Sequence, residues 1–145
     1  MYKWIIKVVK RRVRRVKQTK RQRKIGLQLH GETARTLVHS RLEHFNKFYN
    51  FSYKRVFIKS QSTRWGSCSS KGNLNFNYRI ALLPSHLADY IIVHELCHLK
   101  EFNHGKSFWD LVAETIENPL ALKTELNKVK INSLLSSISS ARLKL

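Results

Sequence analysis

Apolar residues recur at helical spacing in two long stretches of the chain. Between residues 32 and 50 nearly every third or fourth position is apolar, which predicts an amphipathic helix with one buried face. The second stretch begins at Pro84, with Ser85 as the expected N-cap, and should end near Phe102 or Asn103. Its apolar residues cover most of the helix circumference, so we predict a central, buried helix.

Apolar and polar residues alternate in three other places, and this pattern predicts strands. Residues 55–60 and 73–83 alternate in this way, and the stretch 66–73 between them is rich in Gly, Ser and Asn, which favour turns. We therefore expect these two strands to form an antiparallel hairpin. Residues 25–29 also alternate, and for residues 1–31 we favour strands over a single helical stripe.

Two shorter helices are expected near the C-terminus, over residues 107–116 and from about Leu120 onward. The elements predict an α+β fold and three regions. These are a basic N-terminal segment of strands or an arm (1–31), a folded domain (32–130) and a Ser-rich C-terminal tail (131–145).

Positive charge is concentrated at the N-terminus. The net charge is +19, and residues 1–24 hold 12 of the 28 Lys and Arg residues and no acidic residue. Such a localised field favours a polyanionic partner, and nucleic acid is one candidate, although charge alone does not identify the polyanion. A solvated basic face without a dedicated partner explains the charge equally well.

The cysteine content and the hydropathy of the chain indicate in which cellular compartment the protein is expected. Cys68 and Cys97 form neither a C-x-x-C pair nor a disulfide framework, so we expect reduced thiols and a cytoplasmic protein. No apolar run approaches the roughly 20 residues that span a bilayer, and we expect no membrane partner. The basic N-terminus also lacks the features of a secretory signal.

The sequence His94-Glu95-Leu96-Cys97-His98 matches the pattern H-E-x-x-H. On a helix, residues i and i+4 lie on one face, so two imidazoles can bind one zinc ion. Glu95 is then placed beside the metal, where it can take a proton from a metal-bound water. Two histidines of an ordinary core are the alternative, but a buried glutamate between them would be costly without a positive partner.

A catalytic zinc site has three protein ligands and one open position. We favour His104 as the third ligand, because the intervening residues let the chain leave the helix and fold back. The competing candidates are the carboxylates Asp110, Glu114 and Glu117 on the next helix, and Cys97 within the motif.

Several motifs together resemble those of the YgjP-like metallopeptidase family, a bacterial relative of the SprT-like and WLM zinc proteases. The matching segments are Arg64-Trp65-Gly66-Ser67-Cys68-Ser69, Asn73-Leu74-Asn75-Phe76-Asn77-Tyr78-Arg79, His94 to His98, Asn103-His104 and Phe108-Trp109. The resemblance covers about residues 33–112. It implies a zincin-like minimal metallopeptidase domain, with a small antiparallel sheet on an active-site helix. His94, His98 and His104 would be its zinc ligands and Glu95 its general base. The N-terminal region departs from the strand-rich start of family members.

The resemblance implies a zinc-dependent hydrolase that cleaves peptide bonds in a protein or peptide substrate. Two alternatives stay open, a zinc-dependent nucleoside triphosphate pyrophosphatase and a nucleic-acid-binding protein with a structural zinc. The intact Glu95 argues against the second, since a structural site needs no base.

Residues 73–80 are the candidate edge strand for binding a peptide by strand addition, and a strand of an ordinary core hairpin is an equally good interpretation. Asn75, Asn77 and Arg79 on this segment are candidate substrate-binding residues. Arg79 would stabilise an oxyanion or, as we slightly prefer, form a surface salt bridge. Trp109 is expected to pack in the core and hold His104 in place. Cys68 is interpreted as a structural turn residue rather than a reactive thiol.

Overall fold

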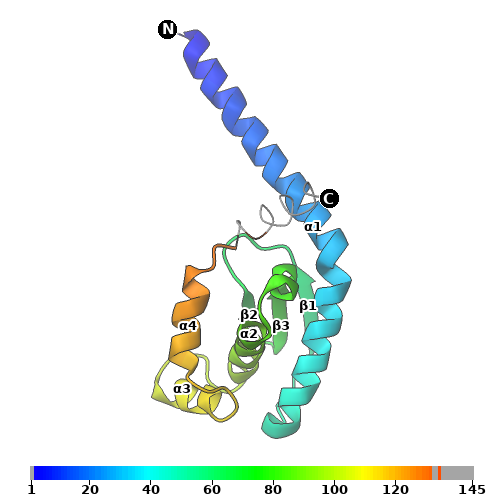
Figure 1. The fold of residues 1–145 in the computed structure, drawn as a ribbon, viewed down its shortest axis with the longest axis vertical. Helices are drawn as coiled ribbons and strands as arrows, with labels where there is room; N and C mark the ends of the chain where they lie inside the picture. Colours follow the sequence, from blue (N-terminus) through cyan, green and yellow to red (C-terminus); the bar gives the residue numbers. More distant parts are fainter. Residues whose placement is uncertain (1, 132–133, 135–145) are drawn as a thin grey trace.

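The computed structural model describes residues 2–131 and residue 134, with side chains described from residue 20 onward. Its elements are α1 (Tyr2–Tyr49), β1 (Arg55–Lys59), β2 (Gly66–Cys68), β3 (Asn73–Asn77), the 3-10 helix η1 (Tyr78–Leu82), α2 (Ser85–Cys97), α3 (Lys106–Ala113) and α4 (Pro119–Lys128). Figure 1 shows α1 along one side of a small sheet, with α2 beside the sheet and α3 and α4 on the side away from α1. The fold is α+β, as the sequence predicts.

The sheet is mixed, with strand order β1-β3-β2. β1 pairs with β3 in parallel, with Arg55 opposite Asn73, whereas β2 pairs with β3 in the antiparallel sense, with Gly66 opposite Phe76. The expected antiparallel hairpin of β1 and β3, and hence an all-antiparallel sheet, was wrong. The turn-rich stretch contains the short strand β2, which is the true hairpin partner of β3. β3 is therefore the central strand, and the prediction that residues 73–80 form an edge was also wrong.

The core forms where α1, the sheet and α2 meet. The predicted buried stripe of α1 is confirmed for Ala34, Val38, Leu42, Phe45 and Tyr49. Phe48, which was expected in the same stripe, is 60% exposed. Alternate residues of β3 and η1 are fully buried, namely Leu74, Phe76, Tyr78 and Ile80. The expectation of a buried central helix is confirmed by α2, whose buried residues include Ile92, Val93 and Leu96.

The N-terminal segment is helical over residues 2–31, so the prediction of strands there was wrong. Its apparent alternation does not mark one buried face, because Ile25 and Leu29 are 43% and 60% exposed, while Leu27 packs against the core. Leu27 and Gly31 instead extend the buried helical stripe of α1 backward from Ala34. α1 is thus continuous across the boundary expected at residue 31.

Helix α1 is tied to α2 by an ion pair. Nε and Nη2 of Arg41 donate to the two carboxylate oxygens of Asp89 at 2.6 and 2.7 Å. Two parallel hydrogen bonds fix the relative orientation of the two side chains as well as the distance between them. The pair orients α2, which carries the H-E-x-x-H motif, against α1.

The ends of α2 differ from the expected ones. Pro84 is the N-cap and Ser85 the first helical residue, so the predicted cap was wrong. The helix ends at Cys97 with His98 as C-cap, several residues before the expected end at Phe102 or Asn103. This early end leaves residues 99–105 free to reverse direction ahead of α3.

The C-terminal helices lie close to their predicted positions, as α3 and α4. The predicted Ser-rich tail falls largely outside the described residues. None of the described helices has the length and hydropathy that a membrane span requires.

Candidate metal centre

Three histidines converge at the end of α2. The Nε2 atoms lie 3.2 Å apart for His94 and His98, 3.1 Å for His98 and His104, and 3.0 Å for His104 and His94. A tetrahedral zinc bound at about 2.0–2.1 Å would need nitrogen separations of about 3.3 Å. The donor set therefore fits one small divalent cation.

The protonation of these histidines also suits a metal site. Burial, together with the nearby His98 and His104, lowers the pKa of His94 to about 3, and burial is also the main cause of the lowered pKa of His104. His98 Nδ1 donates to the carbonyl oxygen of Glu101 at 2.8 Å, which leaves Nε2 as the nitrogen that faces the other two histidines. Neutral imidazoles with converging lone pairs are the form that binds a metal.

Glu95 lies against the first residue of β2. Its side chain is 7% exposed, and burial raises its pKa to about 8, opposed by the positive charge of Arg64. A Cβ added at Gly66 would come within 2.7 Å of Glu95 Cγ and 2.8 Å of Oε1. The glycine therefore allows the strand backbone to approach the carboxylate directly.

Aromatic rings hold the three imidazoles in place. The ring of Phe108, which is fully buried, lies 4.8, 4.5 and 4.8 Å from the rings of His94, His98 and His104. Trp109 Nε1 donates to the carbonyl oxygen of His104 at 3.1 Å, and the two rings stack at 5.8 Å. The expected role of Trp109 beside His104 agrees with this contact.

Three supporting residues were not given roles from the sequence. Phe108 and Gly66 lie inside the recognised motifs, but their functions depend on contacts between distant segments. Tyr90 had a local signal, because it precedes His94 by four residues. Its hydroxyl lies 3.4 Å from His94 Nδ1.

The competing ligand candidates lie elsewhere. Among the described residues, the only group of three or more His, Cys, Asp or Glu side chains with the spacing of a metal site is the histidine trio. Asp110 accepts from Lys106 Nζ at 2.6 Å. Cys97 is fully buried, and burial raises the pKa of its thiol to about 12.

The candidate substrate residues Asn77 and Arg79 are buried instead. Asn77 Nδ2 donates to the carbonyl oxygens of Gln61 and Arg64 at 2.8 and 2.9 Å. Arg79 is 1% exposed and donates to the same Gln61 carbonyl at 3.0 Å, so the expected surface salt bridge was wrong. These two side chains hold the segment before β2, and neither is accessible to a substrate. Asn75 is half-buried, and its Nδ2 lies 3.3 Å from Ser67 Oγ.

The side chain of Cys68 is half-buried on β2. Burial and the nearby Glu95 raise the pKa of its thiol to about 11. The thiol is therefore protonated at neutral pH, in keeping with a structural role.

Comparison with known proteins agrees with this site. The family model of the YgjP-like metallopeptidase domain matches residues 2–129. The metallopeptidase zymogen of Pyrococcus abyssi abylysin is 25% identical, with a TM-score of 0.55, over 61% of this chain and 90% of that chain. The metallopeptidase zymogen of Methanocaldococcus jannaschii jannalysin is 24% identical, with a TM-score of 0.48, over 65% of this chain and 91% of that chain. No curated protein matches this sequence.

The fold and the histidine cluster, together with the family match and the similarity to the abylysin zymogen, define a metal-dependent peptidase. The chain belongs to the YgjP-like family and carries its metallopeptidase domain. The resemblance found in the sequence motifs is therefore confirmed. The matched region includes all of α1, so the basic N-terminal segment lies within it from residue 2 onward.

Proposed function

We propose that this protein is a zinc endopeptidase in which His94, His98 and His104 hold the metal and Glu95 is the general base. The observation that carries the proposal is the convergence of three Nε2 atoms within 3.2 Å of one another. A purely structural zinc would need a fourth protein ligand. Within the described part of the chain, no fourth His, Cys, Asp or Glu joins the cluster.

Glu95 directly follows His94 on α2, and its buried environment suits a proton carrier. When bound at the three histidines, zinc supplies Lewis-acid chemistry that brings the pKa of water toward about 7. A carboxylate oxygen of Glu95 accepts a proton from the attacking water while the oxygen atom of that water forms a bond to the scissile carbonyl carbon. The same carboxyl group then delivers the proton to the leaving nitrogen as the C–N bond breaks. Burial of Glu95 favours this exchange, because it holds the pKa near neutrality.

The free edge of β2 provides a place for the substrate backbone. Asn77 N donates to Trp65 O at 2.7 Å and Ser69 N donates to Asn73 O at 2.9 Å. Hydrogen-bonded pairs alternate along an antiparallel ladder, so the backbone groups of Gly66 and Cys68 point away from β3. An extended peptide can pair with them by strand addition, alongside the strand that approaches Glu95 at Gly66.

The test is metal content and turnover measured on the same preparations. We expect about one zinc per chain and cleavage of an unfolded protein such as casein. Chelation should abolish the cleavage and zinc should restore it. His104→Ala should lose both zinc and activity. Pyrophosphate release from nucleoside triphosphates without proteolysis would instead support the pyrophosphatase alternative.

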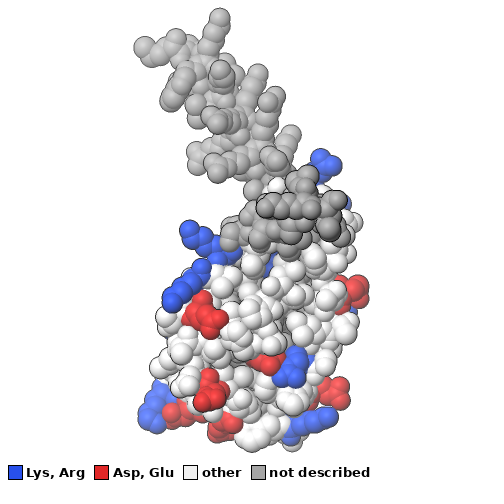
Figure 2. All heavy atoms as spheres, viewed as in Figure 1, with Lys and Arg blue, Asp and Glu red and all other residues white. Residues whose placement is uncertain are grey.

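We also propose that the N-terminal half of α1 binds a polyanion such as nucleic acid. Figure 1 shows this half extending away from the rest of the fold, and its sequence over residues 1–24 contains no acidic residue. On the face in Figure 2, by contrast, acidic and basic side chains are interspersed over the body. Binding should weaken steeply with salt, with a slope that falls when Arg11, Arg12, Arg14 and Arg15 are replaced by Gln. A slope unchanged by this replacement would contradict the proposal.

A further inference from the structure

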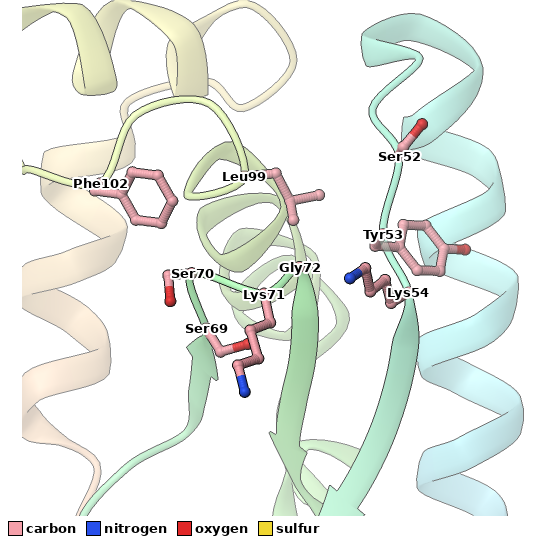
Figure 3. A pocket seen from close by; sticks show the side chains of 9 residues that line it. All are labelled: Ser52, Tyr53, Lys54, Ser69, Ser70, Lys71, Gly72, Leu99 and Phe102. Carbon is pink, nitrogen blue, oxygen red and sulfur yellow. The ribbon is translucent and has the colours of Figure 1, made fainter.

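A pocket of about 360 Å³ lies where the β2–β3 turn meets the loop that follows α2 (Figure 3). Three segments contribute to it: the residues just before β1, the β2–β3 turn and the loop that follows α2. The side chains that matter for its chemistry are Ser52, Lys54, Ser69, Ser70, Lys71 and Phe102. We refer to it as the Lys54–Lys71 pocket.

The lining of this pocket is positive and rich in hydroxyl groups. It contains two lysines and three serines and no acidic side chain. Lys54 and Lys71 are exposed, and neither belongs to the ion pairs formed among the described residues. Ser69 Oγ accepts from Asn73 N at 3.1 Å, which leaves its hydroxyl hydrogen available to a ligand. Ammonium and hydroxyl donors without an opposing carboxylate favour an anion.

One side of the pocket is apolar. Leu99 and Phe102 come from the loop after α2, and Phe102 is 58% exposed. Figure 3 shows these two side chains on the loop above the β2–β3 turn, and Lys54 on the chain that leads into β1. Apolar groups next to ammonium groups suit an anionic group carried on an aliphatic stem. Aspartate and glutamate side chains have this form.

The pocket continues the substrate path proposed for β2. Ser69 directly follows Cys68, the last residue of β2, and Leu99 directly follows His98. Gly66, which lies on Glu95, is three residues before Ser69, a span of about 10 Å at about 3.3 Å per strand residue. A peptide paired with β2 would therefore reach the pocket with a side chain two or three residues from its scissile bond.

We propose that the Lys54–Lys71 pocket is a specificity subsite for an acidic side chain of the peptide substrate. This inference rests on the proposed peptidase function and names the substrate class of that site. Both lysines are exposed, and an exposed ion pair contributes modestly. The expected preference for glutamate over glutamine at the matching peptide position is about 5- to 30-fold.

Long-range attraction by the positive chain must be separated from this local effect. Steering by net charge raises the encounter rate with any acidic peptide, wherever its acid lies. Peptides of one composition, with a single glutamate moved from position to position, all carry the same charge. A preference confined to one position therefore reports the pocket and not the overall field.

The experiment uses the full chain loaded with zinc and such a set of ten-residue peptides with one fixed cleavage site. Cleavage is measured with wild type and with the double variant Lys54→Gln, Lys71→Gln. Binding of the same peptides to the zinc-loaded Glu95→Gln variant, with and without the two lysine changes, is measured by fluorescence anisotropy. Lys59→Gln is the matched control, because Lys59 lies at the opposite end of β1, across from Asn77.

The proposal expects one favoured glutamate position, two or three residues from the cleaved bond, in both readouts. The double variant should remove the preference and the control should keep it. A flat profile, or a preference that survives the double variant, would overturn the proposal. So would a preference for phosphoserine without one for glutamate, or displacement of the peptides by inorganic phosphate at micromolar concentration. Position-dependent binding without any cleavage would leave the subsite standing and contradict the proposed peptidase function instead.

Discussion

The metal centre and the Lys54–Lys71 pocket both use residues of α2 with its following loop and of β2 with its following turn. They differ in how strongly their side chains are buried and held. At the centre, each imidazole packs against the buried ring of Phe108, and Glu95 is 7% exposed. In the pocket, Lys54 and Lys71 are exposed and reach no acidic partner among the described residues. Bond cleavage requires atoms held in one geometry, whereas selection of a charged side chain tolerates mobile ammonium groups. Substitutions at the metal centre should therefore abolish proteolysis, whereas substitutions in or near the pocket should alter only its rate or its substrate preference.

The largest effect is expected from removing a histidine of the cluster. His98→Ala should lose zinc, and with it all measurable proteolysis. Because zinc binds only the folded chain, a thousandfold excess over its Kd should raise the free energy of unfolding of the wild type by about 4 kcal/mol. Thermal melts with and without zinc measure this difference. His86→Ala, which removes an exposed histidine paired with Glu125, should keep both zinc and activity. Equal zinc-dependent stabilisation of the two variants would rule out the assigned ligands.

The next effect concerns the contact between β2 and Glu95. In Gly66→Ala the new Cβ would displace the carboxylate, and we expect kcat to fall about a hundredfold while zinc stays bound. Steady-state kinetics with metal analysis measure this change. Gly105→Ala is the control, because a Cβ there meets no atom within 4 Å. Similar rates for both variants would show that the strand does not position the base.

A smaller effect is expected from the support of His104. Trp109→Phe removes the donor to the His104 carbonyl while keeping an aromatic ring. We expect about a tenfold weaker affinity for zinc, as for other groups that orient a ligand. Competition with a chromogenic chelator measures this affinity. An unchanged zinc affinity in Trp109→Phe would contradict the role of Trp109.

The last prediction concerns Cys68, at the boundary between the two regions, where the expected effect is on thiol reactivity and not on function. Its pKa of about 11, against an ordinary value of 9.0, means about a hundredfold less thiolate at pH 7.5. Alkylation by iodoacetamide, followed by peptide mapping, should therefore be about a hundredfold slower than for a free thiol. Its rate should rise tenfold per pH unit to about pH 10. A rate that levels off near pH 9 would mean that burial beside Glu95 does not control this thiol.

The metal centre was accessible to sequence reasoning because its spacing is local. His94 and His98 are related by one helical turn, and the short loop to His104 limits where that side chain can go. Phe108 and Gly66 could not be assigned in the same way, because their roles depend on contacts across the fold.

The sheet was less accessible because strand pairing is not local. β2 has only three residues, Gly66, Ser67 and Cys68, all half-buried and without apolar alternation. No sequence feature of β1 or β3 indicates that these two strands pair in parallel. Arg79 was misread for a related reason, since burial of a charged residue depends on carbonyl groups such as that of Gln61. In residues 1–31, the alternation at Ile25, Leu27 and Leu29 suggested a strand. The helical periodicity of this segment is clear only when it is considered together with residues 32–49 of α1.

The most direct test of the central claim is the turnover of zinc-loaded Glu95→Gln on a protein substrate, with zinc measured in the same sample. The account predicts a full complement of zinc and a kcat lower than that of the wild type by about 10³-fold or more, since the variant keeps the ligands and lacks the base. Glu95→Asp should recover part of the activity. Wild-type turnover in zinc-loaded Glu95→Gln would contradict the assignment of this glutamate, and with it the proposed mechanism.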